Sequence, residues 1–274
     1  MKSAVKKFLP SFVIDAWISS RLRMMEYRDR NKSAEDVFGD IYTRNRWGGK
    51  AGELNSGSGS DDVVILPYIE MMEARAEADG FKGSVFVDLG CGDFRVGRKL
   101  MPLCSNYIGV DIVKAVVKRN AELYGNETTT FKHLDIIDED LPDGSACTIR
   151  QVLQHLSNEQ ISKVISKLDK YKWVFITEHY PSDNKNILPN VDKVHGGGIR
   201  LYKNSGVYLS EFPFNIPAEQ IEQVLEVRPP ATSDGRDAGV IRTFLYRPRA
   251  AWVPGFKDER HSLSSDGADY SKRD

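Results

Sequence analysis

Short apolar runs alternate with helical stretches through the middle of the chain. Apolar residues at helical spacing in VVILPYIEMMEARAEA predict a helix over residues 63–78. After it, the pattern predicts strands at 84–89, 107–112, 129–134, 146–152 and 172–178, and helices that begin near residues 95, 114 and 157. Strands that alternate with helices form a parallel sheet covered on both faces. The sequence therefore predicts an α/β fold with a doubly wound sheet.

The N-terminal region departs from this alternation. A helix expected after Pro10 brings four apolar residues to one face, with basic residues on either side: Phe12, Val13, Ala16 and Trp17. Such a helix is typical of a membrane interface, although we expect it to pack on its own domain or on a second subunit. Polar residues interrupt the apolar part, and no small-residue cleavage site follows, so we do not interpret it as a signal peptide.

Composition narrows the class of protein. The chain has 274 residues, 41% of them hydrophobic, which suits a soluble globular protein. A net charge of −1 gives no general reason to bind nucleic acid. Three scattered cysteines indicate neither a disulfide framework nor a zinc site. We expect a cytoplasmic protein, with the inner face of the membrane as an alternative location.

Three segments follow from these patterns. Residues 1–60 form an N-terminal helical region that ends in the Gly/Ser-rich stretch WGGKAGELNSGSGSDD. Residues 61–250 form the α/β domain, with an insert at 190–217. Residues 251–274 form a polar tail with almost no apolar content, which we expect to be disordered.

The stretch VFVDLGCGDFRVG, residues 85–97, indicates a cofactor loop after the first predicted strand. Gly90, Gly92 and Gly97 give the spacing G-x-G-x-x-x-x-G, and the displaced third glycine serves a pyrophosphate less well than G-x-G-x-x-G does. Asp88 comes directly before the first glycine pair and suits a cationic ammonium rather than a phosphate. Asp111, which ends YIGVDI about twenty residues on, suits ribose hydroxyls in either kind of cofactor.

Taken in order, VDLGCG, YIGVDI, HLDI and IRQVLQHL resemble the class I S-adenosylmethionine-dependent methyltransferases over roughly residues 60–248. The resemblance implies a Rossmann-like sheet of seven mostly parallel strands. It also implies S-adenosylmethionine as the cofactor, which leaves as S-adenosylhomocysteine. The cofactor-binding residues are then Asp88, Gly90, Cys91, Gly92, Asp111, Ile112, Asp135, Ile136 and Arg150.

The Gly/Ser-rich stretch is similar to a segment that precedes the first strand in some small bacterial methyltransferases of glycan or secondary-metabolite pathways. That resemblance implies a lid over the cofactor, with Trp47, Ser58 and Ser60 as contacts. The insert mixes glycines with polar and aromatic residues, which predicts a hairpin that covers the substrate. Its candidate substrate-binding residues are His195, Arg200, Tyr202 and Asn204.

Three residues are candidates for a catalytic base. His155 follows the fourth predicted strand, just before Ser157, which is a plausible helix N-cap. A histidine there is suited to take a proton from the acceptor, or it caps local backbone. Glu178 and His179 end the fifth predicted strand, where the glutamate is either a base with a raised pKa or a structural partner of nearby amides.

Several alternatives stay open at this point. In IRQVLQHL, Arg150 binds a carboxylate or phosphate of the substrate, or it pairs with Asp135. We expect O-methylation of a small polar acceptor, such as a saccharide or a glycan precursor. The alternatives are N-methylation of a protein side chain or a small amine, and a non-catalytic scaffold. No residue spacing demands a metal, and a homo-oligomer and a peripheral membrane contact are possible associations.

Overall fold

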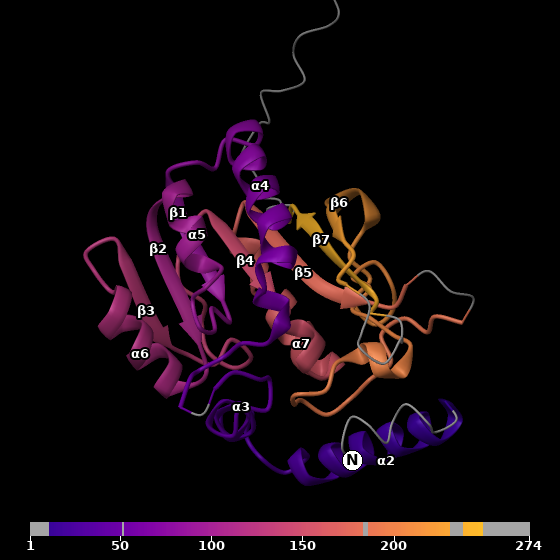
Figure 1. The fold of residues 1–274 in the computed structure, drawn as a ribbon. Helices are drawn as coiled ribbons and strands as arrows, with labels where there is room; N and C mark the ends of the chain where they lie inside the picture. Colours follow the sequence, from indigo (N-terminus) through magenta and orange to yellow (C-terminus); the bar gives the residue numbers. More distant parts are fainter. Residues whose placement is uncertain (1–10, 51, 183–185, 231–237, 249–274) are drawn as a thin grey trace, which may run out of the picture.

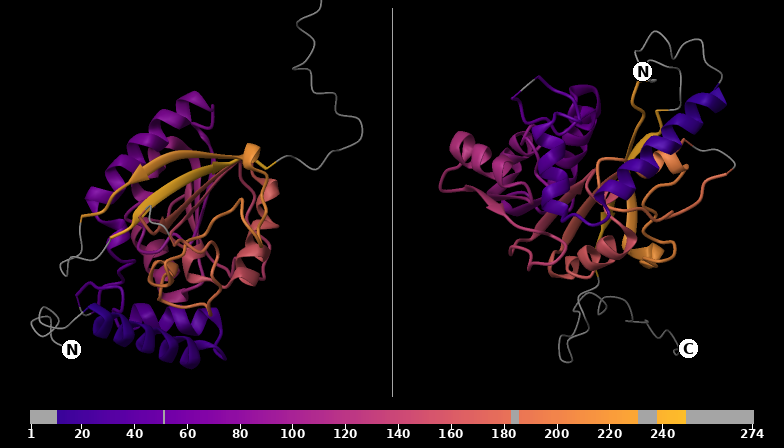
Figure 2. Two further views of the ribbon diagram at one scale, coloured as in Figure 1. Left: turned by 90° about the vertical axis from the view of Figure 1, so that its right-hand side faces the viewer. Right: turned by 90° about the horizontal axis from the view of Figure 1, so that it is seen from below.

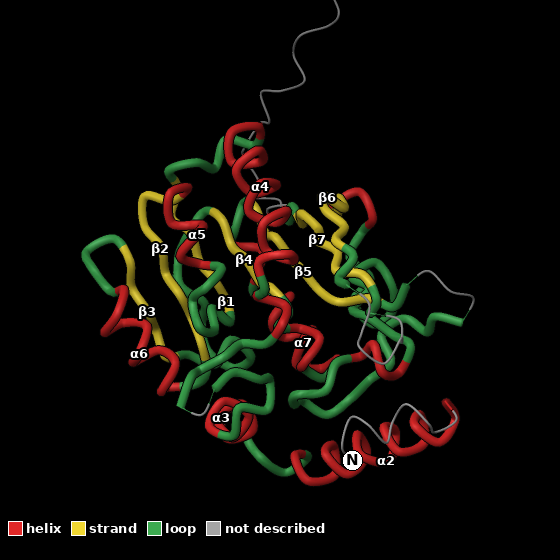
Figure 3. Tube along the Cα trace, in the orientation of Figure 1, coloured by secondary structure: helices red, strands yellow, loops and turns green. Residues whose placement is uncertain are grey.

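A seven-stranded sheet forms the centre of the molecule (Figures 1 and 3). The computed structural model describes residues 11–50, 52–182, 186–230 and 238–248. The strands are β1 (Ser84–Leu89), β2 (Cys104–Asp111), β3 (Thr129–His133), β4 (Ala146–Arg150), β5 (Trp173–Tyr180), β6 (Ile221–Val227) and β7 (Val240–Tyr246). Their order is β3-β2-β1-β4-β5-β7-β6, and only the pairs that include β7 are antiparallel. The predicted fold class is confirmed.

Alternate residues of the strands face two separate layers of helices. In β1, Phe86 belongs to one buried cluster and Val87 to the other, and in β5 Phe175 and Val174 divide in the same way. The cluster of Phe86 and Phe175 includes residues of α4 (Asp62–Ala78) and α5 (Gly97–Leu100), and the opposite cluster includes residues of α6 (Lys114–Tyr124) and α7 (Asn158–Ile165). The near-continuous apolar strands of the sequence are thus explained by burial on both faces.

The predicted helices are present, with one difference in length. The helix expected from residue 95 is only the single turn of α5, followed by a 3₁₀ turn at Met101–Leu103. Pro102 lies in that turn, and a proline has no N–H with which to extend the α-helical hydrogen bonding. The capping box at Ser157 is confirmed, because Ser157 Oγ accepts from Gln160 N at 3.2 Å while Gln160 Oε1 accepts from Ser157 N at 3.0 Å.

Two N-terminal helices lie beyond the carboxyl ends of the parallel strands (Figure 1). They are α2 (Ser11–Asp29) and α3 (Ala34–Thr43), and the second view in Figure 2 shows α2 beside the insert. Glu26 of α2 pairs with Lys203 of the insert at 2.8 Å, so α2 packs on its own chain, as we expected. The side chains of Phe12, Val13 and Ala16 lie outside the described part of the chain. None of the described helices is long and apolar enough to cross a membrane.

The prediction of a hairpin at 190–217 is wrong. The insert contains no strand, and its one regular element is the 3₁₀ helix Arg200–Lys203. Asn190 takes the place of a strand partner, since its Oδ1 accepts from Tyr208 N at 2.8 Å and its Nδ2 donates to Tyr208 O at 2.8 Å. A side-chain amide thus satisfies backbone groups that a ladder would otherwise pair. The predicted disordered tail lies outside the described residues.

Candidate active site

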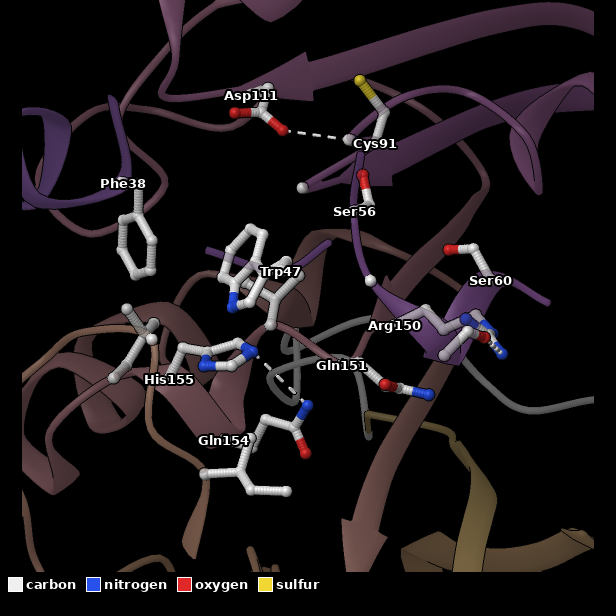
Figure 4. Close-up of a pocket in the computed structure, with 18 of the residues that line it drawn as sticks. Phe38, Trp47, Ser56, Ser60, Cys91, Asp111, Arg150, Gln151, Gln154 and His155 are labelled. Carbon is white, nitrogen blue, oxygen red and sulfur yellow. Dashed lines mark hydrogen bonds between the residues drawn. The ribbon is translucent and has the colours of Figure 1, made fainter. Parts of the chain in front are cut away.

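One pocket of about 740 Å³ opens where the order of the strands reverses, between β1 and β4 (Figure 4). A doubly wound sheet binds its ligands at this point. All the residues that the sequence predicts for the cofactor line this pocket: Trp47, Ser58, Ser60, Asp88, Gly90, Cys91, Gly92, Asp111, Ile112, Asp135, Ile136 and Arg150. Folding therefore brings the four separate motifs and the Gly/Ser-rich stretch to one place.

The glycine loop is held by the end of β2. Gly90 N and Cys91 N both donate to Val110 O, at 2.8 and 2.9 Å, and Gly92 N donates to Asp111 Oδ2 at 3.0 Å. Gly90 and Gly92 have φ values of 82° and 54°, which a residue with a Cβ rarely adopts. Burial raises the pKa of Asp111 to about 6, so its carboxylate is ionised above that pH and accepts from donors in the pocket.

Asp88 joins the pocket wall to the sheet. Its Oδ1 accepts from Thr148 Oγ1 at 2.9 Å, and its Oδ2 accepts from the hydroxyl of Tyr107. Burial raises the pKa of Asp88, whereas these two hydrogen bonds favour the ionised form. Each carboxylate oxygen has a second lone pair, so Asp88 can still accept from a cation in the pocket.

The Gly/Ser-rich stretch is fastened to the glycine loop. Ser56 N donates to Asp93 Oδ2 at 2.9 Å, and Asp93 N donates to Ser56 Oγ at 2.8 Å. The Tyr42 hydroxyl lies 3.0 Å from the same Ser56 Oγ. These reciprocal bonds make the stretch one wall of the pocket rather than a free linker, and its role as a lid over the cofactor stays a prediction.

His155 lies at the opposite end, among aromatic rings. Its ring centroid is 5.2 Å from that of Trp47 and 6.3 Å from that of Phe38, and Figure 4 shows Trp47 between His155 and Asp111. His155 Nδ1 is 3.1 Å from Gly196 O, and because a carbonyl only accepts, Nδ1 carries the hydrogen. Burial, followed by the charge of Lys193, lowers the pKa of His155 to about 3. The ring is neutral at physiological pH, and its Nε2 accepts from Gln154 Nε2 at 3.5 Å.

Glu178 is a positioning residue, and its prediction as a catalytic group is wrong. Its side chain is fully buried outside the pocket lining, and its carboxylate accepts from the amides of Val152, Leu153 and Gln154 at 3.2, 2.9 and 3.0 Å. Burial raises the pKa of Glu178, whereas the three amide donors and the charge of Arg200 oppose this rise and favour the ionised form. The carboxylate thereby holds the turn that carries His155.

Arg200 binds the carbonyl groups of the turn that carries His155. Its Nη1 donates to Leu153 O at 3.2 Å and to Gln154 O at 3.3 Å, while Nη2 donates to Asn158 Oδ1 at 2.7 Å. The side chain is fully buried outside the pocket lining, so the prediction of substrate contact at Arg200 is wrong. The nearby charge of Arg200 favours the ionised form of Glu178 across the turn.

Of the remaining candidates, two line the pocket and two lie outside it. Tyr202 and His179 line the pocket, and His179 Nε2 donates to Ala238 O at 2.6 Å. His195 lies outside the pocket, with Nε2 3.0 Å from Lys32 O, and Asn204 Nδ2 donates to Asn186 O at 2.6 Å. His195 and Asn204 therefore stabilise the fold of the insert, and the structure contradicts their prediction as substrate contacts.

Several side chains of the pocket were not predicted from the sequence, and Tyr68 of α4 is one of them. Phe38 and Tyr42 come from α3, one turn apart, and Gln151 and Gln154 come from the turn after β4. The i, i+4 spacing of the two aromatic residues placed them on one helix face, a signal that was available. Nothing in the sequence indicated which face of α3 meets the pocket.

Comparison with known proteins adds independent findings. Residues 87–171 match the model of a methyltransferase domain. A curated relative, phosphoethanolamine N-methyltransferase 1 of Triticum aestivum, is 26% identical over 188 residues, which cover 61% of this chain and 37% of the relative. The chain thus spans little more than a third of that relative's length.

Two solved structures share the fold. One is the N-methyltransferase NodS of Bradyrhizobium japonicum in complex with S-adenosyl-L-homocysteine, with a TM-score of 0.51, 12% identity and coverage of 71% of this chain and 93% of that one. The other is the 1,6-didemethyltoxoflavin-N1-methyltransferase of Burkholderia thailandensis, with a TM-score of 0.52, 14% identity and coverage of 78% and 87%. At these identities the likeness concerns the fold alone.

Proposed function

The chain carries a class I S-adenosylmethionine-dependent methyltransferase domain, and from this premise we propose that it methylates the nitrogen of a small amine. The cofactor supplies the methyl group as an electrophilic sulfonium. The acceptor then binds at the end of the pocket formed by Trp47, Gln154 and His155. The rest of the proposal concerns what these side chains do for an amine.

The residues of the pocket fit the cofactor. Asp111 offers an anionic carboxylate to ribose hydroxyls, and Asp135 and Ile136 line the same end of the pocket, where the adenine is expected. At the other side of the glycine loop, Asp88 and Arg150 line the wall together and present opposite charges. Opposite charges side by side match the amino-acid end of S-adenosylmethionine.

The surroundings of His155 carry the proposal. The ring lies beside Trp47 and Phe38, with its Nδ1 hydrogen directed at Gly196 O. A hydroxyl must lose its proton as it attacks, and a ring whose pKa is lowered to about 3 is a weak proton acceptor. A neutral amine attacks with its lone pair and keeps its protons until the methyl group has moved. His155 Nε2 accepts from Gln154 Nε2 at 3.5 Å in the free protein. An amine N–H that takes the place of this long hydrogen bond has its lone pair oriented for a direct displacement.

The aromatic walls support the same acceptor. Methyl transfer makes the nitrogen positive, and the faces of aromatic rings attract cations within about 6 Å. The ring of Trp47 lies beside His155, with Tyr42 at 5.3 Å and Phe38 at 6.2 Å from it. The curated relative named above is also an N-methyltransferase, although the chain spans only 37% of its length.

A saccharide hydroxyl, the acceptor that we expect from the sequence, remains the second candidate. The polar side chain of Gln154 at the acceptor end favours it, because an amide can donate to and accept from hydroxyl groups. A protein side chain, which stood beside the small amine among the alternatives, would have to enter the same pocket. One assay can compare methyl transfer to an amine with methyl transfer to a saccharide hydroxyl.

The test uses S-adenosylmethionine with a labelled methyl group and three acceptors: ethanolamine, glucosamine and N-acetylglucosamine. Glucosamine offers an amine and hydroxyls on one ring, and acetylation blocks the amine alone. We expect N-methylglucosamine and no transfer to N-acetylglucosamine, with the position of the label read by tandem mass spectrometry. Equal transfer to both sugars, with the label on oxygen, contradicts the amine and supports the saccharide hydroxyl.

A further inference from the structure

Three buried hydrogen-bond donors lie together without partners at the Ser60 side of the pocket. Within the described residues, no acceptor is in reach of the Tyr68 hydroxyl, of Arg150 Nε or of Gln151 Nε2. A buried polar atom without a partner costs free energy, so such atoms are rare in folded proteins. Three of them at one place indicate that a ligand completes the site.

The three side chains are neighbours beneath the 3₁₀ turn Ser58–Ser60. The guanidinium of Arg150 lies 5.3 Å from the centroid of the Tyr68 ring, and its Nη2 donates to Gly59 O at 2.7 Å. A Cβ on Gly59 would lie 2.1 Å from Gln151 Oε1, so the Gln151 amide lies directly against the same turn. Figure 4 shows Arg150 and Gln151 on the Ser60 side of the pocket, away from Phe38.

The local backbone supports a functional role for this cluster. Gln151 has a φ of 56°, a conformation that residues other than glycine rarely adopt. It is held there by the hydrogen bond from Gln151 N to Thr177 O at 2.6 Å. The ion pair that the sequence suggested between Arg150 and Asp135 does not form among the described residues, so Arg150 is left with one hydrogen-bond acceptor, Gly59 O.

We infer that Tyr68, Arg150 and Gln151 form a carboxylate site, and that it binds the amino-acid carboxylate of the cofactor. Arg150 Nε and Gln151 Nε2 only donate and the Tyr68 hydroxyl can donate, and an ionised carboxylate accepts from all three. Arginine binds a carboxylate through two parallel N–H donors, of which Nε is one. Asp88 lines the same part of the pocket, and it can accept from the adjacent ammonium of the amino acid. This inference rests on the cofactor of the proposed function but not on the acceptor.

The decisive variant is Tyr68→Phe, because the hydroxyl that it removes has no partner in the free protein. The variant should unfold at the same or a higher temperature than the wild type without ligand. Isothermal titration should then show that it binds S-adenosylhomocysteine about 3- to 10-fold more weakly, the loss of one hydrogen bond. Arg150→Lys keeps the charge but loses the paired donors, and we expect about 10- to 100-fold weaker binding.

A second ligand identifies the part of the cofactor that is bound. Methylthioadenosine has the nucleoside and the sulfur but no amino-acid carboxylate, so both variants should bind it as tightly as the wild type does. Tyr27→Phe and Arg98→Lys are matched controls, since both residues are exposed and lie outside the pocket. They should leave the affinity for both ligands unchanged.

Each other result overturns the inference. Unchanged affinity of both variants for S-adenosylhomocysteine means that the carboxylate binds elsewhere, and equal losses for the two ligands mean that the substitutions disturb the nucleoside instead. A wild-type protein that binds neither ligand contradicts the proposed function itself. Binding by the wild type with no transfer to an amine contradicts only the acceptor and leaves the carboxylate site standing.

Discussion

The two ends of the pocket are assembled in different ways. At the cofactor end, the glycine loop and the end of β2 belong to neighbouring strands and are joined by backbone hydrogen bonds, such as that from Gly90 N to Val110 O at 2.8 Å. At the acceptor end, His155 depends on Glu178 of β5 and on Arg200 of the insert, which are both fully buried. The first end is built by sheet pairing, and the second by buried charges from distant segments.

This difference predicts which substitutions destabilise the whole domain and which have only a local effect. A buried charge that loses its partner destabilises the whole domain, because desolvation of the remaining charge is no longer compensated. Loss of a hydrogen bond near the surface has a smaller and more local effect. The four predictions below test the comparison in order of decreasing effect.

Glu178→Gln should have the largest effect. The substitution leaves the buried Arg200 without its nearby negative charge and weakens three hydrogen bonds to the turn. We expect the free energy of unfolding, measured with urea, to fall by about 3 kcal/mol. Glu159→Gln, at an exposed position of α7, is the matched control and should change it little. If Glu178→Gln lowers the free energy of unfolding as little as the control does, buried charges do not hold the acceptor end together.

His155→Gln should lower activity without lowering cofactor affinity. The variant loses the ring acceptor at the acceptor end, so kcat should fall about 100-fold. The affinity for S-adenosylhomocysteine should stay within about 2-fold of the wild type, because the glycine loop does not depend on His155. His133→Gln serves as the control outside the pocket lining. A parallel loss of cofactor affinity would show that the two ends are not independent.

The same histidine should give the stability a pH dependence. The pKa of His155 is about 3 in the folded protein, below the usual histidine value of 6.5, so the unfolded chain binds more protons between these two values. Stability from this group is complete above pH 6.5 and falls by about 1.4 kcal/mol per pH unit as the pH drops below it. The measurement is the difference in unfolding free energy between the wild type and His155→Gln at several pH values. A difference that does not change with pH would contradict a buried, neutral ring.

Ser56→Ala should have the smallest effect. It removes the hydroxyl that accepts from Asp93 N and pairs with Tyr42, so the Gly/Ser-rich wall loses its fastening to the glycine loop. We expect a loss of about 1 kcal/mol in unfolding free energy and a modest loss of cofactor affinity, both measurable by thermal shift. Ser162→Ala, at an exposed position of α7, is the control. If Ser56→Ala lowers the unfolding free energy as much as Glu178→Gln does, the expected order of the two effects is wrong.

The residues of the cofactor end could be predicted from the sequence more fully than those of the acceptor end. The predicted cofactor residues all line the pocket, because each follows a strand directly and parallel strands bring their carboxyl ends to one edge. Of the residues predicted to act on the acceptor, His155, His179 and Tyr202 line it, whereas Glu178 and Arg200 are buried beside it. Residue type and position alone did not separate a catalytic carboxylate from one that holds a turn.

Local pattern by itself determined the strands β1 to β5, the main helices and the glycine loop with its acid, and the family resemblance of these motifs indicated the class of cofactor. These features depend on the alternation of side chains and on backbone conformations that short stretches of sequence impose. Only the tertiary structure decided that Glu178 and Arg200 hold the turn of His155, and that Tyr68, Arg150 and Gln151 meet beneath Gly59. Those contacts join residues that are far apart in the chain, so burial and charge at these positions exist only once the segments have packed together.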